Sequence, residues 1–567
     1  MRVTRGWYIR SCAALLAGTL GTASAQTSPP DIGTTLREME QQRPAPPQPP
    51  KPALDIQQSA PNAKDSAPGA LFPVGQIRVT GSTAYPAKRL EALVSQYAGH
   101  QTSLTDLRQG AATITRFYRN LGFPLARAYV PSQSIRNGVV EISVLEGHYG
   151  KLAIEDEAGV SAGLVRRLMR NTTSAELIRS APLERDLLLL QELQGVVATA
   201  TLRPGEQVGT ADLIVHLTPG PRYQGSVDVD NFGNRYTGQW RAGLGFTGSN
   251  LAGFGDQLAL RGVFTDQHGV AYGRASYQIP IDDLRIGAAV TRTDYTLGKQ
   301  FAALDASGHA TVSTLYLQYP IVRSLSASLD TQLAFSYGDL EDNVDATSTT
   351  DPRSSREVTL SVTGNVRDDF LSGGITSGTL SYVNGKLAIR DPTAWEIDQA
   401  TARTAGGFDK IAYTALRLQD FGQEIHLYIA VSGQLAGKNL DPSEKFNLGG
   451  PDAVRAYPQG EGVGDSGLLG TLELRHTPAV LLPYARPELI AFFDGGRINT
   501  NQNPFVPGAN SSRLFGAGVG LNLFLRDGFR IRANWAWKVG ERPALSAPDS
   551  ASRGWVQFGM DFPRTDR

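Results

Sequence analysis

The chain contains a single cysteine, Cys12, in 567 residues. Disulfides and cysteine-ligated metal sites are therefore excluded as sources of stability. Basic residues are not in excess either, because 54 Lys and Arg balance 54 Asp and Glu. A neutral chain gives no electrostatic reason to expect a nucleic-acid partner. Mean hydropathy is −0.21, and no stretch of 18 consecutive apolar residues occurs, which excludes a bundle of membrane helices.

Motifs of soluble enzymes are also missing. The seven histidines are scattered without an H-E-x-x-H pair, and no G-x-x-x-x-G-K-[ST] phosphate loop is present. One G-x-G-x-x-G match begins at Gly243, but it lies in an alternating, strand-like run rather than before a helix. We therefore expect no metal, no cofactor and no enzymatic activity. A barrel-shaped phospholipase or protease stays open as an alternative, because catalytic triads are assembled in space rather than in sequence.

The first 25 residues have the pattern of a secretory signal peptide. Arg2, Arg5 and Arg10 precede or flank a short apolar core, "CAALLAGTL", and the small-residue sequence "ASA" ends at Ala25. We expect residues 1–25 to be removed and the chain to be exported. An exported chain without a helical span is either released or crosses a membrane as a barrel.

Residues 26–43 contain a candidate helix, "DIGTTLREMEQQR", which starts after a plausible cap at Asp31. Ile32, Leu36 and Met39 form a narrow apolar stripe at helical spacing. Residues 44–71 are rich in Pro, Ala and Gln and predict an extended, semi-rigid linker. The alternative is a disordered N-terminus with only transient helix.

Two units of similar outline follow, over residues 72–147 and 148–220. Each reads as a strand, two amphipathic helices and a pair of strands, which makes them an internal repeat. In the first unit, Asn137-Gly138 is a strong signal for a tight turn.

The chain from 221 to 562 has no helical periodicity and predicts an all-β domain, with residues 563–567 as a tail. Connections on one side of the strands are short, as at 321–324, and most on the other side are long, as at 434–467. Short periplasmic turns with long outer loops are typical of outer-membrane barrels. We predict sixteen antiparallel transmembrane strands: 223–231, 237–247, 256–265, 270–279, 285–294, 312–320, 325–337, 355–367, 375–384, 409–418, 424–433, 468–476, 486–494, 514–524, 529–538 and 555–562.

Two local motifs carry a resemblance to a known family. "VRAY" at Val454 to Tyr457 is similar to a V-R-G-Y/F loop signature, and "FFDGG" contains Phe492, Asp494 and Gly496 at the positions of an F-x-D-x-G strand signature. With the export signal, the tethered helix and the repeats, the chain resembles the outer-membrane transporters of two-partner secretion (TpsB family). One departure is Ala456 in place of the family glycine, which leaves the backbone conformation there open.

The resemblance implies α+β periplasmic POTRA repeats followed by a 16-stranded antiparallel transmembrane barrel. It also implies an Arg455–Asp494 pair, flanked by Val454, Tyr457, Phe492 and Gly496, which holds loop 434–467 inside the pore. The helix with Ile32, Leu36 and Met39 would plug the pore at rest. The implied partner is a large secreted exoprotein with an N-terminal secretion domain, carried by a monomer in the lipid of the outer membrane of a Gram-negative bacterium.

A POTRA signature in "RFYRNLGFPLARAYVP" offers weak candidates for substrate capture: Arg116, Tyr118, Gly122, Phe123, Ala126 and Pro131. Helical spacing favours a packing role for the apolar residues of this segment. Two other functions stay open. A barrel-assembly or insertion factor would share the barrel and both motifs but usually carries more periplasmic units, and a diffusion porin has no need of such units.

Overall fold

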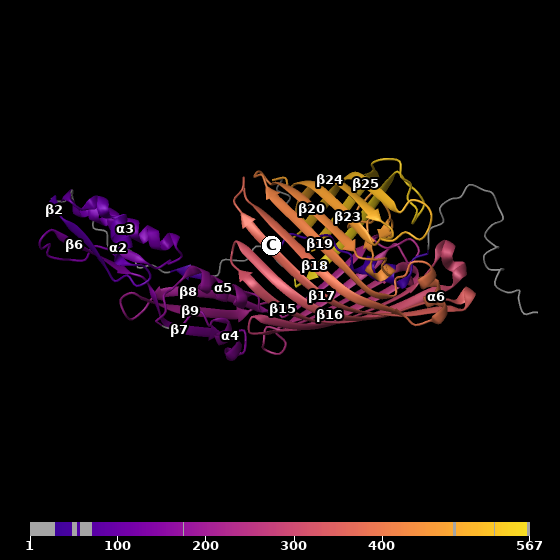
Figure 1. Ribbon diagram of the computed structural model, residues 1–567, viewed down its shortest axis with the longest axis horizontal. Coiled ribbons are helices and arrows are strands. Elements are labelled where there is room, and N and C mark those ends of the chain that lie inside the picture. Colours follow the sequence, from indigo (N-terminus) through magenta and orange to yellow (C-terminus); the bar gives the residue numbers. More distant parts are fainter. Residues whose placement is uncertain are drawn as a thin grey trace, which may run out of the picture.

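The computed structural model describes residues 29–47, 54–56, 71–173, 175–479, 484–526 and 528–563. The predicted signal peptide lies outside these residues. Two small α/β units stand in line with one end of a large barrel (Figure 1). Among the described residues, no helix is long and apolar enough to cross a membrane.

The first unit folds around a three-stranded sheet, in the order β3-β6-β5, against which two helices pack. Ser103 and Asp106 form a capping box at the start of α3, as helices that begin with Ser and an acid three residues later commonly do. The turn at Asn137-Gly138 has positive φ at both residues, as its sequence predicts. The elements are β2 (Phe72–Val74), β3 (Gln76–Thr80), α2 (Ala87–Leu93), η1 (Ser95–Tyr97), β4 (His100–Thr102), α3 (Leu104–Asn120), β5 (Arg127–Tyr129) and β6 (Val139–Leu145).

The second unit contains a four-stranded sheet in the order β1-β8-β9-β7. Its outer strand, β1 (Leu54–Ile56), comes from the Pro-rich linker and runs parallel to β8, with Leu54 opposite Ala200. The linker is therefore not only an extended tether, because three of its residues complete a sheet. The other elements are β7 (His148–Asp156), α4 (Ala162–Leu168), α5 (Ser180–Gln191), β8 (Val196–Pro204) and β9 (Thr210–Pro219).

Sixteen antiparallel strands close the barrel, and the last pairs with the first from Gly225–Phe562 to Asp230–Gln557. Outward apolar side chains alternate with inward polar ones, as lipid outside and water inside require. The strands are β10 (Tyr223–Asp230), β11 (Arg241–Ser249), β12 (Gln257–Thr265), β13 (Val270–Ile281), β14 (Leu284–Thr296), β15 (Ala306–Arg323), β16 (Ala327–Val344), β17 (Thr349–Asp368), β18 (Gly374–Ile389), β19 (Gly406–Asp420), β20 (Ile425–Ala436), β23 (Ser466–His476), β24 (Ala485–Asn499), β25 (Ser511–Leu525), β26 (Phe529–Lys538) and β27 (Ser552–Phe562).

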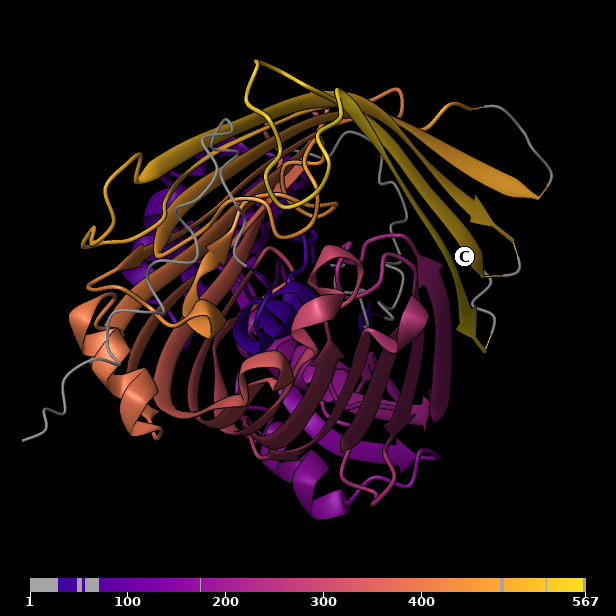
Figure 2. The ribbon, with the colours of Figure 1, turned by 90° about the vertical axis from the view of Figure 1, so that its right-hand side faces the viewer.

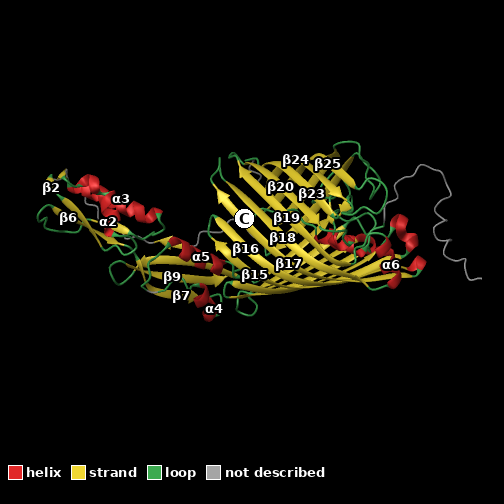
Figure 3. Cartoon of the chain, in the orientation of Figure 1, coloured by secondary structure: helices red, strands yellow, loops and turns green. Residues whose placement is uncertain are grey.

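The number of barrel strands agrees with the prediction, but several predicted strands are too short at their outer ends. β17 has 20 residues where 355–367 was expected, and β15 begins at Ala306 rather than 312. The added segments, such as "TTDPRS", are polar on both faces, so the alternation that marks a lipid-facing strand is missing there. Loops and short helices lie at this end, away from the two units (Figure 3): η2 (Asp266–His268), η3 (Lys299–Leu304), η4 (Asp345–Thr347) and α6 (Pro392–Ala400).

The N-terminal helix α1 (Ile32–Glu40), the plug helix, lies inside the ring of strands (Figure 2). Ile32 and Leu36 are buried against inward-facing side chains, among them Tyr236 and Tyr295, and Met39 packs at the edge of the same cluster. The apolar stripe read from the sequence therefore faces the barrel wall. The helix ends three residues earlier than the predicted segment.

Candidate functional site: the locked loop and the plug helix

The loop between β20 and β23, residues 437–465, folds back into the barrel and is called the folded loop. It brings Arg455 against the wall at Asp494. Arg455 Nε donates to Asp494 Oδ2 at 2.7 Å, and Nη2 donates to Oδ1 at 2.8 Å. The backbone N–H of Arg455 also donates to Oδ2 at 3.2 Å. Both residues are fully buried. A bidentate pair of this kind fixes direction as well as distance.

The neighbouring motif residues pack around the buried Arg455 and the loop that carries it. The Arg455 guanidinium carbon lies 3.2 Å from the ring centroid of Phe492, and the indole N–H of Trp555 donates to the Arg455 carbonyl at 2.8 Å. A Cβ at Gly496 would lie 2.3 Å from Leu448 of the loop, so this position needs glycine. Val454 is buried in the same cluster, and the hydroxyl of Tyr457 donates to the carbonyl of Arg542 at 3.1 Å.

Ala456 does not occupy the left-handed backbone region, which resolves the question raised by the missing family glycine. The residue is buried, and its methyl group faces Gly516 of β25. A Cβ added at Gly516 would lie 2.6 Å from the Ala456 Cβ. Glycine at position 516 therefore leaves the space that the Ala456 methyl group occupies.

A second carboxylate, Glu473 on β23, also faces the arginine, and the sequence motifs do not include it. Arg455 Nη1 lies 2.7 Å from Glu473 Oε1, although the N–H is not aligned for a hydrogen bond. Glu473 is fully buried and also pairs with Arg475 at 2.6 Å and with Arg43 at 2.5 Å. The only signal in the sequence is the run of polar residues Thr471, Glu473 and Arg475 on one face of a strand.

Arg43 belongs to the segment that follows the plug helix α1, so Glu473 connects this segment to the folded loop. Arg43 Nη2 also donates to the carbonyl of Pro451, which lies in the loop, at 3.2 Å. One buried carboxylate is thus shared by an arginine from the plug segment and an arginine from the loop. A change at either arginine alters the charge seen by the other.

The start of the plug helix is held by a separate set of charges. Asp31 caps the helix by accepting from the Thr34 N–H at 2.7 Å. The Ile32 N–H donates to Asp342 of the wall at 2.9 Å. Arg353 then pairs with both Asp342 and Asp441, and Asp441 lies in the folded loop, at 2.6 Å from Arg353. The helix N-terminus therefore contacts the wall at Asp342, and Arg353 links that carboxylate to Asp441 of the loop.

Two acidic side chains of the plug, the buried Glu38 and the half-buried Asp31, have no ion-pair partner among the described residues. Glu38 accepts a hydrogen bond from Asn234 Nδ2 at 2.9 Å, and burial raises the pKa of its carboxyl to about 7. Burial, with the neighbouring Asp342 carboxylate, raises the pKa of Asp31 to about 6. Removal of a carboxylate from water favours its protonated form, so the docked helix favours protonation at both positions.

The folded loop lies directly on the plug. At Gly33 a Cβ would lie 2.4 Å from the backbone nitrogen of Ser443, which belongs to the short helix η5 (Pro442–Glu444). Further along, Arg37 Nε donates to the Lys445 carbonyl at 3.2 Å. Two short loop strands, β21 (Phe446–Asn447) and β22 (Val463–Gly464), pair beside it.

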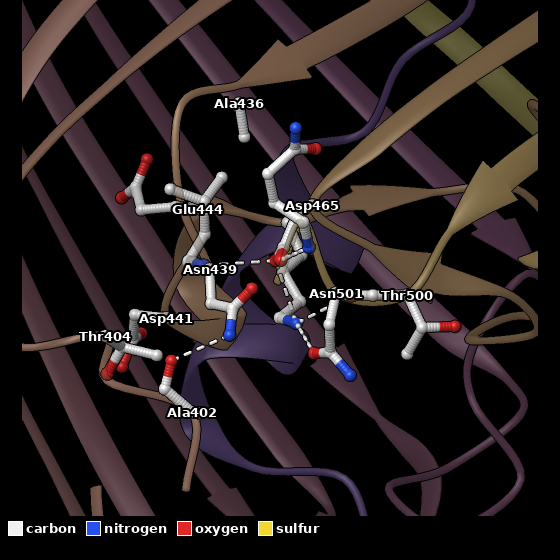
Figure 4. A network of polar contacts seen from close by, with 12 residues as sticks. Ala402, Thr404, Ala436, Asn439, Asp441, Glu444, Asp465, Thr500 and Asn501 are labelled. Carbon is white, nitrogen blue, oxygen red and sulfur yellow. Dashed lines mark hydrogen bonds and ion pairs between the residues drawn. The ribbon is translucent and has the colours of Figure 1, made fainter. Parts of the chain in front are cut away.

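A polar network fastens the base of the folded loop to neighbouring outer loops (Figure 4). The buried Asp465 accepts from the N–H groups of Leu440 and Gln502, at 3.1 and 2.7 Å. Asn439 donates to the carbonyls of Ala402 and Asn503, at 2.8 and 2.9 Å. Because these partners come from three loops, the network holds the root of the loop independently of Arg455.

Two cavities flank the C-terminal end of the plug. One of about 620 Å³ is lined by Asp228, Arg241, Arg261 and other charged groups of the wall. The other, of about 310 Å³, lies beside the loop near Asn447. The lumen beside the plug is thus polar and partly open.

The predicted capture residues of the first unit are mostly structural. Tyr118 is fully buried, and its hydroxyl donates to Glu146 at 2.6 Å, while Phe123 and Ala126 lie in the same core. Gly122 adopts a φ of 85° at the end of α3. Arg116 is exposed and Pro131 is half-buried. Glu146, which also accepts from Thr83 and Ala84, is the organising polar residue, and the sequence reasoning missed it.

The second unit is fixed to the barrel by ion pairs at two periplasmic turns. Asp283 pairs with Arg170 at 2.7 Å and with Arg185 at 3.0 Å. Glu192 of the same unit pairs with Arg323 at 2.5 Å and with Arg285. These contacts set the orientation of the unit relative to the barrel.

Comparisons with known proteins give one consistent result. The sequence matches the haemolysin secretion/activation protein ShlB/FhaC/HecB model over residues 209–523 and the ShlB-type POTRA domain model over residues 72–147. It is 29% identical to the heme/hemopexin transporter protein HuxB of Haemophilus influenzae, over 89% of this chain and 91% of the relative. It is 22% identical to the outer membrane transporter CdiB of Dickeya dadantii, over 97% of this chain and 98% of the relative.

Solved structures show the same fold. CdiB from Escherichia coli superposes with a TM-score of 0.72, at 17% identity, over 95% of this chain and 100% of that one. BamA from Haemophilus ducreyi lacking POTRA domains 1–3 has a TM-score of 0.50, at 15% identity, over 87% of this chain. The predicted fold class, with POTRA-type structure before a closed 16-stranded barrel, is confirmed.

Proposed function

Because the chain belongs to the haemolysin secretion/activation (ShlB/FhaC/HecB) family of two-partner secretion transporters, we propose that it secretes one large exoprotein through its barrel. Members of this family are outer-membrane transporters rather than enzymes, and the POTRA region lies in the periplasm. The observation that carries the proposal is that a tethered helix and a folded loop both occupy the lumen of the barrel and both meet Glu473.

We propose that the exoprotein reaches the POTRA units unfolded and is captured by addition as an extended strand. The support is β1, which already pairs with the edge strand β8 over Leu54 to Ile56. An edge that accepts one extended segment offers the same backbone groups to another. The capture residues named from the sequence, such as Tyr118 and Phe123, would support the first unit from within rather than contact the exoprotein.

Passage would then require the plug helix to leave the pore. The Pro-rich linker tethers the helix, and the ion pairs and hydrogen bonds that hold the helix in the pore can break and form again. No nucleotide-binding motif is present, so folding of the exoprotein outside the cell is the proposed driving force. The protein would act as a monomer in outer-membrane lipid.

The test compares the proteins in the medium and in the outer membrane of cells with and without this gene. Loss of one large secreted protein, with outer-membrane proteins unchanged, is expected. Complementation with Arg455→Ala should leave secretion reduced at least tenfold, because Asp494 and Glu473 would lose a buried partner at about 3–5 kcal/mol. Arg530→Ala, which removes a half-exposed ion pair with Asp561, is the matched control and should restore secretion.

The alternative is a factor that inserts or assembles other outer-membrane barrels, as the likeness in fold to BamA permits. The two functions predict different losses. Broad depletion of outer-membrane barrels without a specific secreted loss would contradict the secretion proposal and favour assembly.

A further inference from the structure

The outward face of strands β14 to β18 changes from apolar to charged at one level. On β17, Val362, Leu360 and Val358 are exposed toward lipid, and the next outward residue is Arg356. On β18, Leu380 and Tyr382 point outward and are followed by Asn384 and then Lys386. These first charges lie toward the end of the barrel that carries α6, away from the POTRA units (Figure 1). They therefore mark the outer boundary of the membrane.

Arg356 and Lys386 are directly opposite each other in the strand register. Both side chains are exposed, and neither forms an ion pair with any described residue. Like charges at directly opposed positions of an antiparallel pair destabilise the sheet. An arrangement of this kind without an ion-pair partner favours the binding of an anion.

The basic residues nearby differ from this pair because they already have partners. Arg292 on β14 pairs with Asp294 at 2.7 Å, and Arg390, just after β18, pairs with Asp339. Asp409 is the other outward carboxylate close by, opposite Asn384, and it makes no ion pair with Lys386. Among the described residues of β14 to β18, the outward basic residues without an ion pair at this level are thus Arg356 and Lys386.

The surroundings leave room for a headgroup and orient the arginine. The positions beside the pair on the outward face are Ser354, Ala388 and Gly407, all small. The Arg356 guanidinium lies 5.9 Å from the ring centroid of Tyr337, and Tyr382 lies one outward position below Asn384. Tyrosines at this depth are typical of the membrane interface, where a ring sits at the level of lipid headgroups.

We propose that Arg356 and Lys386 bind the phosphate of a phosphorylated lipid in the outer leaflet. A guanidinium and an ammonium side by side can share one phosphate, with the arginine contributing paired N–H donors and the lysine a point charge. The lipid chains would continue over Leu360 and Leu380 on the apolar face below. Lipid bound there would hold the long β17–β18 hairpin, which carries α6, at a constant depth in the membrane.

The experiment measures lipid retention by native mass spectrometry of the full chain in detergent. The probes are bisphosphorylated lipid A and the same lipid after removal of its phosphates. We expect the wild type to retain the phosphorylated form preferentially, and Arg356→Gln with Lys386→Gln to lower its affinity roughly 30-fold. The matched control, Arg292→Gln with Arg530→Gln, removes two exposed arginines that already have acidic partners and should keep most of the affinity.

Three outcomes would overturn the proposal: equal retention of the two lipids by the wild type, equal losses in the test and control variants, or complete displacement of lipid A by 10-fold excess inorganic phosphate. The last outcome would show a site for free phosphate. The single variant Lys386→Gln provides the same comparison if the double variant fails to fold, as judged by its heat-modifiable mobility on a gel. Secretion is not the readout, so failure here is distinct from failure of the proposed function.

Discussion

Removal of the Arg43 side chain tests whether Glu473 joins the plug to the barrel wall. In the structure Arg43 is 14% exposed and lies 2.5 Å from the fully buried Glu473 carboxylate. A hydrogen bond to a charged group contributes about 1.5–3 kcal/mol. We take about 2 kcal/mol, because Glu473 keeps Arg455 and Arg475 when Arg43 is removed. Since 1.36 kcal/mol is a factor of ten, Arg43→Ala should shift the plug equilibrium toward the open pore about 30-fold.

The assay is the fraction of time that single channels are open in planar bilayers. Arg43→Ala should raise this fraction in the otherwise unchanged protein. In a Glu473→Gln background the same substitution should have a much smaller effect, because only the hydrogen bond from Arg43 to the Pro451 carbonyl is then lost and Arg43 lies near Arg455 without the shared carboxylate. This non-additivity is the coupling that a double-mutant cycle measures.

Arg37 provides the control within the plug, because its side chain donates to the Lys445 carbonyl and has no ion pair among the described residues. Arg37→Ala should shift the equilibrium only about fivefold, and equally in both backgrounds. The reasoning is refuted if Arg43→Ala opens the channel to the same extent with Glu473 and with Gln at that position.

Three further changes test contacts of the plug and the loop. Gly33→Ala should expel the plug and raise channel opening at least tenfold, because the new Cβ would lie 2.4 Å from the Ser443 backbone nitrogen; closed channels would contradict the packing. Glu38 has a pKa of about 7 in the docked helix against its ordinary 4.5, so docking is fully favoured below pH 4.5 and is weakened by about 3 kcal/mol as pH rises through 7. Opening should therefore increase between pH 5 and pH 8. In channel recordings Glu38→Gln should remove the increase above pH 6 and leave the smaller contribution of Asp31 below it. Gly516→Ala should weaken secretion because its Cβ would lie 2.6 Å from that of Ala456. Ala456→Gly in the same chain should restore secretion. If secretion is not restored, a contact other than that with Ala456 requires glycine at position 516.

The barrel and the Arg455–Asp494 pair were predictable because both leave a local record. Strands that face lipid and water alternate with period two, and long loops gather on one side. Arg455 and Asp494 lie within two short motifs, and it is the resemblance of these motifs to the TpsB family that implies their pairing. No comparable sequence pattern identifies Glu473, since a lumen-facing glutamate between two leucines is ordinary in any barrel strand. Its importance arises only when β23, the loop and the plug segment are placed together.

The linker strand and the outer strand ends were missed for related reasons. Leu54 to Ile56 is a three-residue segment within a Pro-rich stretch, and composition there predicts a tether. Its pairing with β8 is a tertiary contact across about 145 positions of sequence, which no local pattern encodes. Beyond the lipid boundary, both faces of β15 to β18 meet water, so the alternation on which strand prediction depends is lost.

Under the proposed function, the charges around Glu473 would set the order in which the helix and the loop move. With the plug in place, Glu473 and Asp494 face Arg43, Arg455 and Arg475, which leaves one positive charge in excess. When the plug leaves, Arg43 goes with it, and two carboxylates remain for two arginines. The loop pair is then better neutralised than before, so departure of the plug does not by itself release the loop. Release of the loop still requires separation of the buried Arg455–Asp494 pair, which costs about 3–5 kcal/mol. We therefore infer that the plug leaves first and that the loop moves in a second step, driven by the exoprotein.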